Sequence, residues 1–161
     1  MKHLFVARHG NYGNDDKLDN LGRKQMETLG KTIKGILNGG SAHIISSTAQ
    51  RALDSSQILA IQLVSPPEFE QIPYLRSGSD APKGSYEWES NNDMVIDIIN
   101  ERREKAEGLV IVTHLEVAES FPTHFLRKEF NEKGRLDGIA KGMAVHFDLE
   151  GRAYQYIPKR R

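Results

Sequence analysis

Two arginines and two histidines in this sequence are residue types that suit phosphoryl chemistry. Arg8 and His9 stand next to each other before Gly10, whereas Arg51 and His114 lie far along the chain. Guanidinium groups pair with phosphate oxygens in a planar, two-pronged geometry. A neutral imidazole is a nucleophile that negatively charged oxygens do not repel. If the fold gathers these four side chains, they predict a site where a phosphoryl group binds and is transferred to His9.

The elements that must position these residues are short apolar runs that end where the site residues begin. The runs cover residues 4–7, 43–45 and 109–112, and such runs are typical of strands buried on both faces of a parallel sheet. Two alternating segments, 143–149 and 153–157, predict a hairpin. Strands that alternate with helices predict an α/β fold, a three-layer sandwich with a mostly parallel sheet and helices on both faces. Ligands bind beyond the carboxyl ends of the strands in such sheets.

Helical patterns separate the strands, and several begin at side chains that can accept hydrogen bonds from free backbone N–H groups. The expected caps are Asp19, a capping box of Ser47 with Gln50 and a second capping box of Thr113 with Glu116. A further helix is expected over about residues 92–105. Pro122 predicts a kink or a break in the last helix. The segment 65–89 holds four of the six prolines and is expected to be mostly loop, with one short strand near 69–72.

The composition bounds the kind of protein. With 161 residues, the chain is expected to form one domain over residues 1–161. Cysteine is absent, which excludes disulfides and cysteine-based zinc sites, and we expect no metal and no cofactor. Lys and Arg balance Asp and Glu at 22 each, which argues against nucleic acid as a partner. The apolar runs are too short for a membrane span or a signal peptide, so we expect no membrane partner and a cytoplasmic protein. The oligomeric state stays open.

Four motifs in the right order give the sequence a resemblance to a known family over nearly its whole length. The motifs are Arg8-His9-Gly10, Leu18-Asp19-x-x-Gly22-x-x-Gln25, Ile45-Ser46-Ser47-x-x-x-Arg51-Ala52 and Val110-Ile111-Val112-Thr113-His114. Together they resemble the pattern of the histidine phosphatase, or phosphoglycerate-mutase-like, superfamily. The resemblance implies a phosphoglycerate-mutase-like fold with His9 as the nucleophile. It also implies that Arg8, Arg51 and His114 hold the phosphoryl group. The short length and the His114-Leu115 junction are most similar to the SixA-type phosphohistidine phosphatases.

Two smaller assignments complete the predicted phosphate-binding residues. Gly10 is expected to let the backbone turn so that His9 points into the site. Many members of the superfamily place an Asn six residues after the nucleophile, where this chain has Asp15. Asn14, one residue earlier, is therefore expected to contact the phosphate.

The proton donor for the leaving group is expected among loop carboxylates. The resemblance points to an acid after the second arginine-bearing helix, where Asp80 and Glu87 are the assigned candidates and Glu89 is a further one. Each of them alone is more typical of a solvated loop. A weak donor favours phosphohistidine or an acyl phosphate as the substrate, because a phosphorylated imidazole leaves with less protonation than an alkoxide does. Glu116 is assigned to its helix cap.

The predicted function is a histidine-dependent phosphatase that hydrolyses a phosphomonoester or a phosphoramidate through a phosphohistidine on His9. Its partner is then a phosphorylated small molecule or a phosphohistidine protein. Two alternatives stay open. A phosphosugar mutase needs a lid that excludes water, and the chain is short for one. A catalytically weak phospholigand-binding module is favoured by the uncommon Thr113-His114-Leu115-Glu116 junction and by the weak set of candidate acids.

Overall fold

The structure of the chain is a computed structural model that describes residues 1–87 and 91–159. One six-stranded sheet, in the order β3-β2-β4-β1-β5-β6, forms its centre. The strands are β1 (His3–Arg8), β2 (Ala42–Ser46), β3 (Glu70–Gln71), β4 (Gly108–Thr113), β5 (Ala144–Asp148) and β6 (Ala153–Ile157). The helices within the described residues are α1 (Asn20–Leu37), α2 (Gln50–Leu63), the 3-10 turn η1 (Pro73–Leu75), α3 (Asn92–Asn100) and α4 (Leu115–Phe130).

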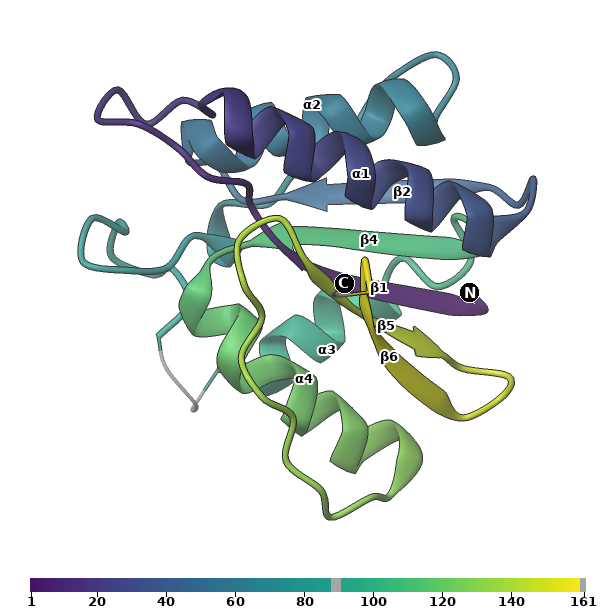
Figure 1. Cartoon of the computed structure of the whole chain (residues 1–161). Coiled ribbons are helices and arrows are strands. Elements are labelled where there is room, and N and C mark those ends of the chain that lie inside the picture. The colour runs from purple at the N-terminus through teal and green to yellow at the C-terminus, as the bar shows by residue number, and fades with distance from the viewer. Residues whose placement is uncertain (88–90, 160–161) are drawn as a thin grey trace.

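The first four strands run parallel, and the last two form an antiparallel hairpin beside β1. This pairing confirms the mostly parallel sheet and the hairpin that the sequence predicts. Arg8 at the end of β1 lies opposite Thr113 of β4, and Ser46 of β2 lies opposite Val112. Three strands therefore end almost in line. The residues that follow them emerge at one edge of the sheet, on the left in Figure 1.

Alternate residues of the central strands supply two separate cores. In β1, Leu4 and Val6 belong to one core, whereas Phe5 and Ala7 belong to the other, and all four are fully buried. Helices α1 and α2 cover the Phe5 side, and α3 and α4 cover the Leu4 side (Figure 1). Burial on both faces explains why these strands are continuous apolar runs. The layers form the sandwich that the sequence predicts.

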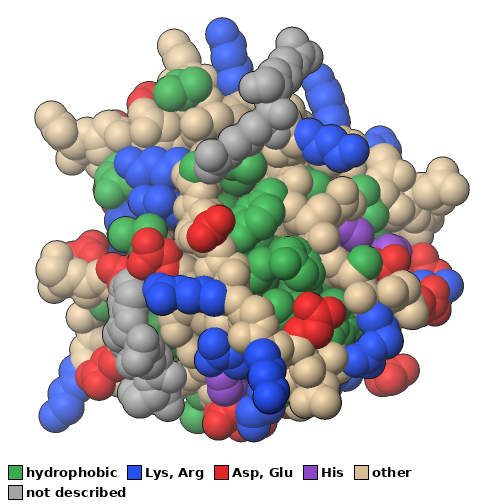
Figure 2. All heavy atoms as spheres, turned by 60° about the horizontal axis from the view of Figure 1, so that its bottom comes forward, with side chains coloured by type: hydrophobic (Ala, Val, Ile, Leu, Met, Phe, Trp, Pro, Cys, Tyr) green, Lys and Arg blue, Asp and Glu red, His purple; other side chains and the backbone are tan. Residues whose placement is uncertain are grey.

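The outer side of α3 and α4 carries charges of both signs. Figure 2 looks onto this side and shows Lys and Arg side chains among Asp and Glu side chains. On these two helices, the Asp93 carboxylate lies 3.2 Å from Lys128 Nζ and 2.9 Å from His124 Nε2. Positive and negative side chains are thus mixed on this side of the molecule, as the equal numbers of basic and acidic residues suggest. Of the helices in the described ranges, none combines the length and the apolar character that a membrane span requires.

Two of the three predicted helix caps are wrong. The Asp19 cap of α1 is confirmed, since its carboxylate accepts a hydrogen bond from the Gly22 N–H at 2.8 Å. Helices α2 and α4 begin without a side-chain cap bond. The Ser47 hydroxyl bonds His114 instead, and the Thr113 hydroxyl donates to a carbonyl of a neighbouring loop. Tertiary partners have therefore taken both hydroxyls that the capping boxes require.

Element boundaries differ from the predictions at three places. Helix α4 is continuous through Pro122, which excludes the predicted break and leaves the kink as a prediction. Phe121 and Phe125 of α4 are fully buried, and this packing outweighs the cost of about 3 kcal/mol that proline carries inside a helix. Helix α3 ends at Asn100 rather than near residue 105, and β3 is only two residues long.

The entry into α1 depends on a close approach of two backbones. A side chain at Gly22 would overlap the carbonyl oxygen of Asn11, and one at Gly10 would lie 2.7 Å from the Gly22 carbonyl oxygen. Gly22→Ala is therefore expected to lower the free energy of unfolding by about 1–3 kcal/mol. Gly35→Ala is the matched control in the same helix, because nothing lies within 4 Å of its would-be Cβ. It should be neutral or stabilise by up to about 1 kcal/mol, and urea unfolding of both variants checks this. Equal effects would contradict the packing argument.

A pair of histidines, the buried His146 and the half-buried His3, links stability to pH. His146 stacks on Phe5 with ring centroids 4.7 Å apart, and its Nε2 lies 3.0 Å from Nδ1 of His3. Burial, with a smaller contribution from the charge of His3, lowers the pKa of His146 from 6.5 to about 4. The unfolded chain therefore takes up a proton at His146 first, and stability falls as the pH drops from about 6.5 to about 4.

At His146 alone, this loss is expected to reach about 2–3 kcal/mol at the acidic end. His146→Gln removes the titrating group, so the plot of unfolding free energy against pH should become shallower between about pH 6.5 and pH 4.5. Urea unfolding across this range measures the slope. A slope as steep as that of the wild type would show that His146 is protonated equally in both states.

Candidate active site

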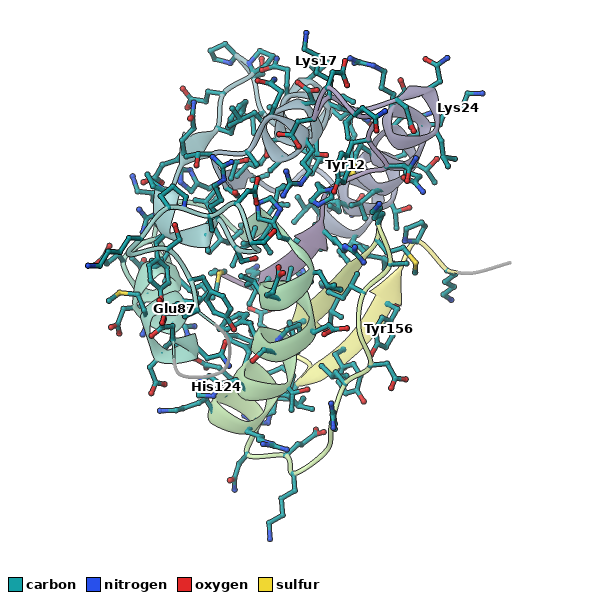
Figure 3. All side chains as sticks on the ribbon, turned by 90° about the vertical axis from the view of Figure 1, so that its left-hand side faces the viewer. Tyr12, Lys17, Lys24, Glu87, His124 and Tyr156 are labelled. Carbon is teal, nitrogen blue, oxygen red and sulfur yellow. The ribbon has the colours of Figure 1, made fainter. Side chains whose placement is uncertain are left out.

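The side chains that the sequence singled out first do converge at the carboxyl edge of the sheet, which faces the viewer in Figure 3. The imidazole rings of His9 and His114 have centroids 5.2 Å apart. Arg51, in the first turn of α2, places its Nε 3.3 Å from Nε2 of His9. The positive charge of Arg8 helps to lower the pKa of His9, and that of Arg76 helps to lower the pKa of His114. We refer to these five side chains as the basic cluster.

His9 is held as a neutral imidazole with a defined tautomer. Its Nδ1 lies 2.9 Å from the Gly10 carbonyl oxygen, so Nδ1–H donates there. Its Nε2 accepts from the Nε–H of Arg51 and therefore carries the lone pair. Burial lowers the pKa of His9 to about 4, the charges of Arg51 and Arg8 add to this, and the Gly10 hydrogen bond opposes it. At neutral pH the ring is thus uncharged and its Nε2 is nucleophilic.

His114 is likewise neutral and buried. Its Nε2 lies 2.6 Å from the hydroxyl oxygen of Ser47 at the end of β2. Burial, together with smaller effects of the neighbouring His9 and Arg51, lowers the pKa of His114 to about 3. A neutral imidazole has one N–H, which it can donate to an oxygen of a bound group. His114 therefore suits a role as a hydrogen-bond donor in the cluster.

Unpaired polar atoms gather in the basic cluster. Among the described residues, four buried side-chain nitrogens or oxygens have no hydrogen-bond partner. Three of them belong to the cluster: Nε of Arg8, Nε of Arg76 and Nδ1 of His114. Buried polar groups in native proteins are nearly always paired, so such a group of orphans indicates a missing partner. An oxyanion, which accepts several hydrogen bonds at once, satisfies the guanidinium nitrogens of Arg8 and Arg76 and an N–H of His114.

Carboxylates surround the arginines of the cluster. Asp16 accepts from Nη1 of Arg51 at 2.6 Å, and its other oxygen accepts from the Gln50 N–H at 3.1 Å. Asp80 lies 3.1 Å from Nη2 of Arg76 and 3.9 Å from Nη1 of Arg51. Asn14, by contrast, is exposed on the turn before Asp16. In this loop it is therefore Asp16, and not Asn14, that the structure brings to Arg51.

The surroundings of Glu87 and Gly10 differ from those that the sequence predicts. Glu87 is exposed, and its charge contributes to the raised pKa of Tyr74, which burial mainly causes. Figure 3 shows Glu87 well away from Tyr12, which lies beside the cluster. Glu89 lies outside the described residues. The Gly10 N–H donates to the Ser55 hydroxyl at 3.0 Å, and its carbonyl accepts from His9.

The role of Gly10 in the structure is thus to orient His9 and to let α1 approach. The φ angle of Gly10 lies outside the left-handed region, so a sharp turn is not the reason for a glycine at this position. The reason is the close carbonyl of Gly22. With both its backbone groups engaged, Gly10 has no free N–H for a phosphate.

Several residues of the site were missed by sequence reasoning. Tyr12 packs its ring edge on His9, with centroids 5.2 Å apart, and the guanidinium of Arg51 lies 5.0 Å from the centre of the Tyr12 ring. Lys141 approaches the same ring, with Nζ 4.7 Å from its centre. Arg76 follows the carboxyl end of β3 and η1, but β3 has only two residues, so the rule that located the other site residues does not reach it. For Tyr12 and Lys141 the sequence offers no comparable signal.

A groove of about 700 Å³ runs along α4, and none of the residues that line it belongs to the basic cluster. Glu119 and Gly138 line one part of it. The charge of Glu119 raises the pKa of Arg8, against the effect of burial. Nη1 of Arg8 donates to the Ile139 carbonyl at 3.3 Å. Arg127 also lines the groove. In the described ranges, no three His, Cys, Asp or Glu side chains gather where they could ligate one metal ion.

Comparisons with known proteins support this picture at the level of the fold. No family model matches the chain, and no curated protein matches it in sequence. The protein histidine phosphatase SixA complexed with tungstate has a TM-score of 0.65 and 16% identity, over 96% of this chain and 93% of that chain. A variant of the phosphoserine phosphatase from Entamoeba histolytica, in complex with phosphoserine, has a TM-score of 0.61 and 16% identity, over 98% and 95% of the two chains.

A mycobacterial glucosyl-3-phosphoglycerate phosphatase in a complex with VO3 has a TM-score of 0.67 and 14% identity, over 97% of each chain. At these identities the similarity defines the architecture alone. It confirms the phosphoglycerate-mutase-like fold that the four motifs imply. The chain therefore has the fold of the histidine phosphatases.

Proposed function

We propose that this chain is a phosphatase that hydrolyses a phosphomonoester or a phosphoramidate through a phosphohistidine formed on His9. The observation that carries the proposal is a neutral, buried imidazole with its lone pair 3.3 Å from a guanidinium, amid orphaned nitrogens of Arg8, Arg76 and His114. A phosphoryl group is the guest that needs a nucleophile and several cationic donors together.

In the first step, Nε2 of His9 attacks phosphorus and the bond from phosphorus to the leaving group breaks. The lowered pKa of His9 keeps this lone pair unprotonated at neutral pH. As the N–P bond forms, the ring gains positive charge, and the Gly10 carbonyl that accepts from Nδ1–H stabilises that charge. Arg51 lies beside Nε2 and can neutralise the phosphoryl oxygens during the transfer.

In the second step, water attacks phosphorus, the N–P bond breaks, and its electron pair returns to Nε2 of His9. The same cationic side chains stabilise both transition states, because the phosphoryl oxygens stay in place while the groups at either end exchange. Burial lowers the pKa of His114 to about 3, so at neutral pH His114 enters the reaction uncharged and offers a hydrogen bond.

Two classes of partner fit the proposal. The structure named a protein histidine phosphatase supports a phosphohistidine protein as the substrate. The phosphoserine phosphatase and the glucosyl-3-phosphoglycerate phosphatase support a phosphorylated small molecule. The basic cluster is compatible with either class, because both carry the phosphoryl group that its unpaired nitrogens can bind.

The test is the release of inorganic phosphate from p-nitrophenyl phosphate and from a phosphohistidine protein, assayed side by side. We expect turnover of at least one of them and inhibition by tungstate, a tetrahedral oxyanion like phosphate. Tungstate at about 100 times its Kd should also raise the free energy of unfolding by about 2.7 kcal/mol. Tungstate binding without phosphate release would indicate a phospholigand-binding module instead. The absence of both tungstate binding and phosphate release would contradict the proposal outright.

A further inference from the structure

The carboxylate of Glu116 lies at the rim of the basic cluster and is not used by the helix that carries it. Glu116 belongs to the first turn of α4, two residues after His114. The capping role expected for it is absent, since α4 has no side-chain cap bond. Its Oε2 instead accepts a hydrogen bond from the hydroxyl of Ser77 at 2.7 Å. Ser77 is buried, so a fixed part of the loop after β3 holds the half-buried carboxylate in place.

The carboxylate of Glu116 is close enough to Arg8, the neighbour of His9, for its charge to affect the pKa of the guanidinium. Burial lowers the pKa of the Arg8 guanidinium, and Glu116 is the largest of the charges that oppose this effect. A Cβ atom at Gly78 would lie 3.6 Å from Oε1 of Glu116 and 3.5 Å from Oδ1 of Asp80. Two carboxylates therefore flank the same point of the loop, and both border the cluster.

The partners of these two carboxylates differ in a way that decides which can supply a proton. Asp80 faces Nη2 of Arg76 at 3.1 Å and Nη1 of Arg51 at 3.9 Å. Guanidinium groups only donate, so they favour the ionised carboxylate. Although burial opposes it, the Arg76 hydrogen bond and the Arg51 charge hold the pKa of Asp80 below its usual value. Asp80 therefore lacks the proton that a leaving group needs.

Glu116 has the opposite kind of partner. The Ser77 hydroxyl can donate to an ionised carboxylate and can accept from a protonated one. A residue that gives a proton in one step and takes one in the next needs such a partner, because the hydrogen bond survives both states. The hydrogen bond also restricts the side chain without removing its second oxygen from use.

We propose that Glu116 is the general acid and base of the reaction, an inference that rests on the proposed function. When Nε2 of His9 attacks phosphorus, the bond from phosphorus to the leaving oxygen breaks, and that oxygen takes its proton from the Glu116 carboxyl group. In the second step, the Glu116 carboxylate takes a proton from the attacking water while the N–P bond breaks. Asp80 is then a positioning residue for Arg76 and Arg51. Phosphomonoesters of alcohols, which need protonation on departure, come within the substrate range.

The experiment compares Glu116→Gln and Asp80→Asn with the wild type on p-nitrophenyl phosphate and on ethyl phosphate. Glutamine keeps the size of Glu116 and the acceptor for Ser77 but has no carboxyl proton to give. The kcat/KM ratio reports the step in which the leaving group departs. For Glu116→Gln, we expect it to fall at least about 100-fold on ethyl phosphate and less than about threefold on p-nitrophenyl phosphate. Asp80→Asn should lower both values by a similar factor.

Two outcomes would overturn the role of Glu116. One is a loss for Glu116→Gln that is equal on the two esters or absent from both. The other is a loss confined to ethyl phosphate in Asp80→Asn, which would make Asp80 the acid. Labelling of His9 separates this failure from that of the proposed function. Normal labelling of the wild type by p-nitrophenyl phosphate, with either outcome above, overturns only the role of Glu116. Absence of label from the wild type overturns the proposed function itself.

Discussion

Replacement of His9 by alanine is expected to lower kcat for p-nitrophenyl phosphate by at least about 10⁴-fold. No other side chain of the basic cluster can replace the lone pair at Nε2. Arg8, Arg51 and Arg76 are protonated, and the neutral ring of His114 is tied at Nε2 to the Ser47 hydroxyl. Steady-state assays on purified wild type and variant give the ratio directly.

The control for this variant is His124→Ala. His124 lies at the surface of α4, where its Nε2 contacts the Asp93 carboxylate at 2.9 Å. Loss of that side chain should leave kcat within about twofold of the wild type, as expected for a surface substitution away from the site. A His9→Ala variant that keeps more than a tenth of the activity while the control is unaffected would show that His9 is not the nucleophile.

Replacement of Arg51 by alanine is expected to lower kcat/KM by about 10²–10³-fold, the usual effect of removing a preorganised donor to developing charge. Arg51 is nearly buried and lies beside Nε2 of His9, and the Asp16 carboxylate and the Tyr12 ring fix its guanidinium. Arg51→Lys should recover only part of the loss, because an ammonium group cannot donate in the planar, two-pronged geometry of a guanidinium.

The matched control for Arg51 is Arg23→Ala, which removes an exposed arginine of α1. It should change kcat/KM by less than about twofold. Thermal unfolding of each variant distinguishes a loss of folded protein from a loss of catalysis. Full recovery of activity in Arg51→Lys would mean that only the positive charge matters at this position. A loss for Arg51→Ala no larger than for the control would remove Arg51 from the reaction.

The central strands and the first four site residues could be predicted from sequence because one physical constraint governs both. The central residues of β1, β2 and β4 are buried on both faces, so these residues are apolar, and polar residues mark the strand ends. Parallel strands bring those ends to the same edge. Arg8, His9, Arg51 and His114 could therefore be placed together without knowledge of any distance between them.

The same argument did not predict Arg76, because the strand that precedes it, β3, is too short to recognise from the sequence. Strand β3 has two residues, and the loop around it holds several prolines. Asp16 was not predicted either, because its position depends on a backbone conformation that the sequence does not specify. Its φ of 63° turns the loop so that its carboxylate meets Arg51 and the start of α2. The neighbouring Asn14, which matched a family pattern more closely, faces solvent.

The errors at the helix starts have a common physical cause. A serine or threonine that caps a helix accepts a hydrogen bond from a backbone N–H, and a buried tertiary partner can hold the hydroxyl away from that N–H. Ser47 lies against His114, and Thr113 donates to the Leu75 carbonyl at 2.9 Å. These partners are remote in sequence, so a local motif cannot reveal them. The error on Thr113 also concealed Glu116, whose assignment to the cap left no carboxylate to consider beside His114.

The most direct test of a phosphohistidine on His9 is acid-quenched labelling with a radioactive phosphodonor. Wild type and His124→Ala should carry a label that is lost in acid and retained in alkali, as expected for an N–P bond, and proteolytic mapping should place it on the peptide that contains His9. His9→Ala should carry none. A label that resists acid, or one that His9→Ala retains in full, would contradict the account.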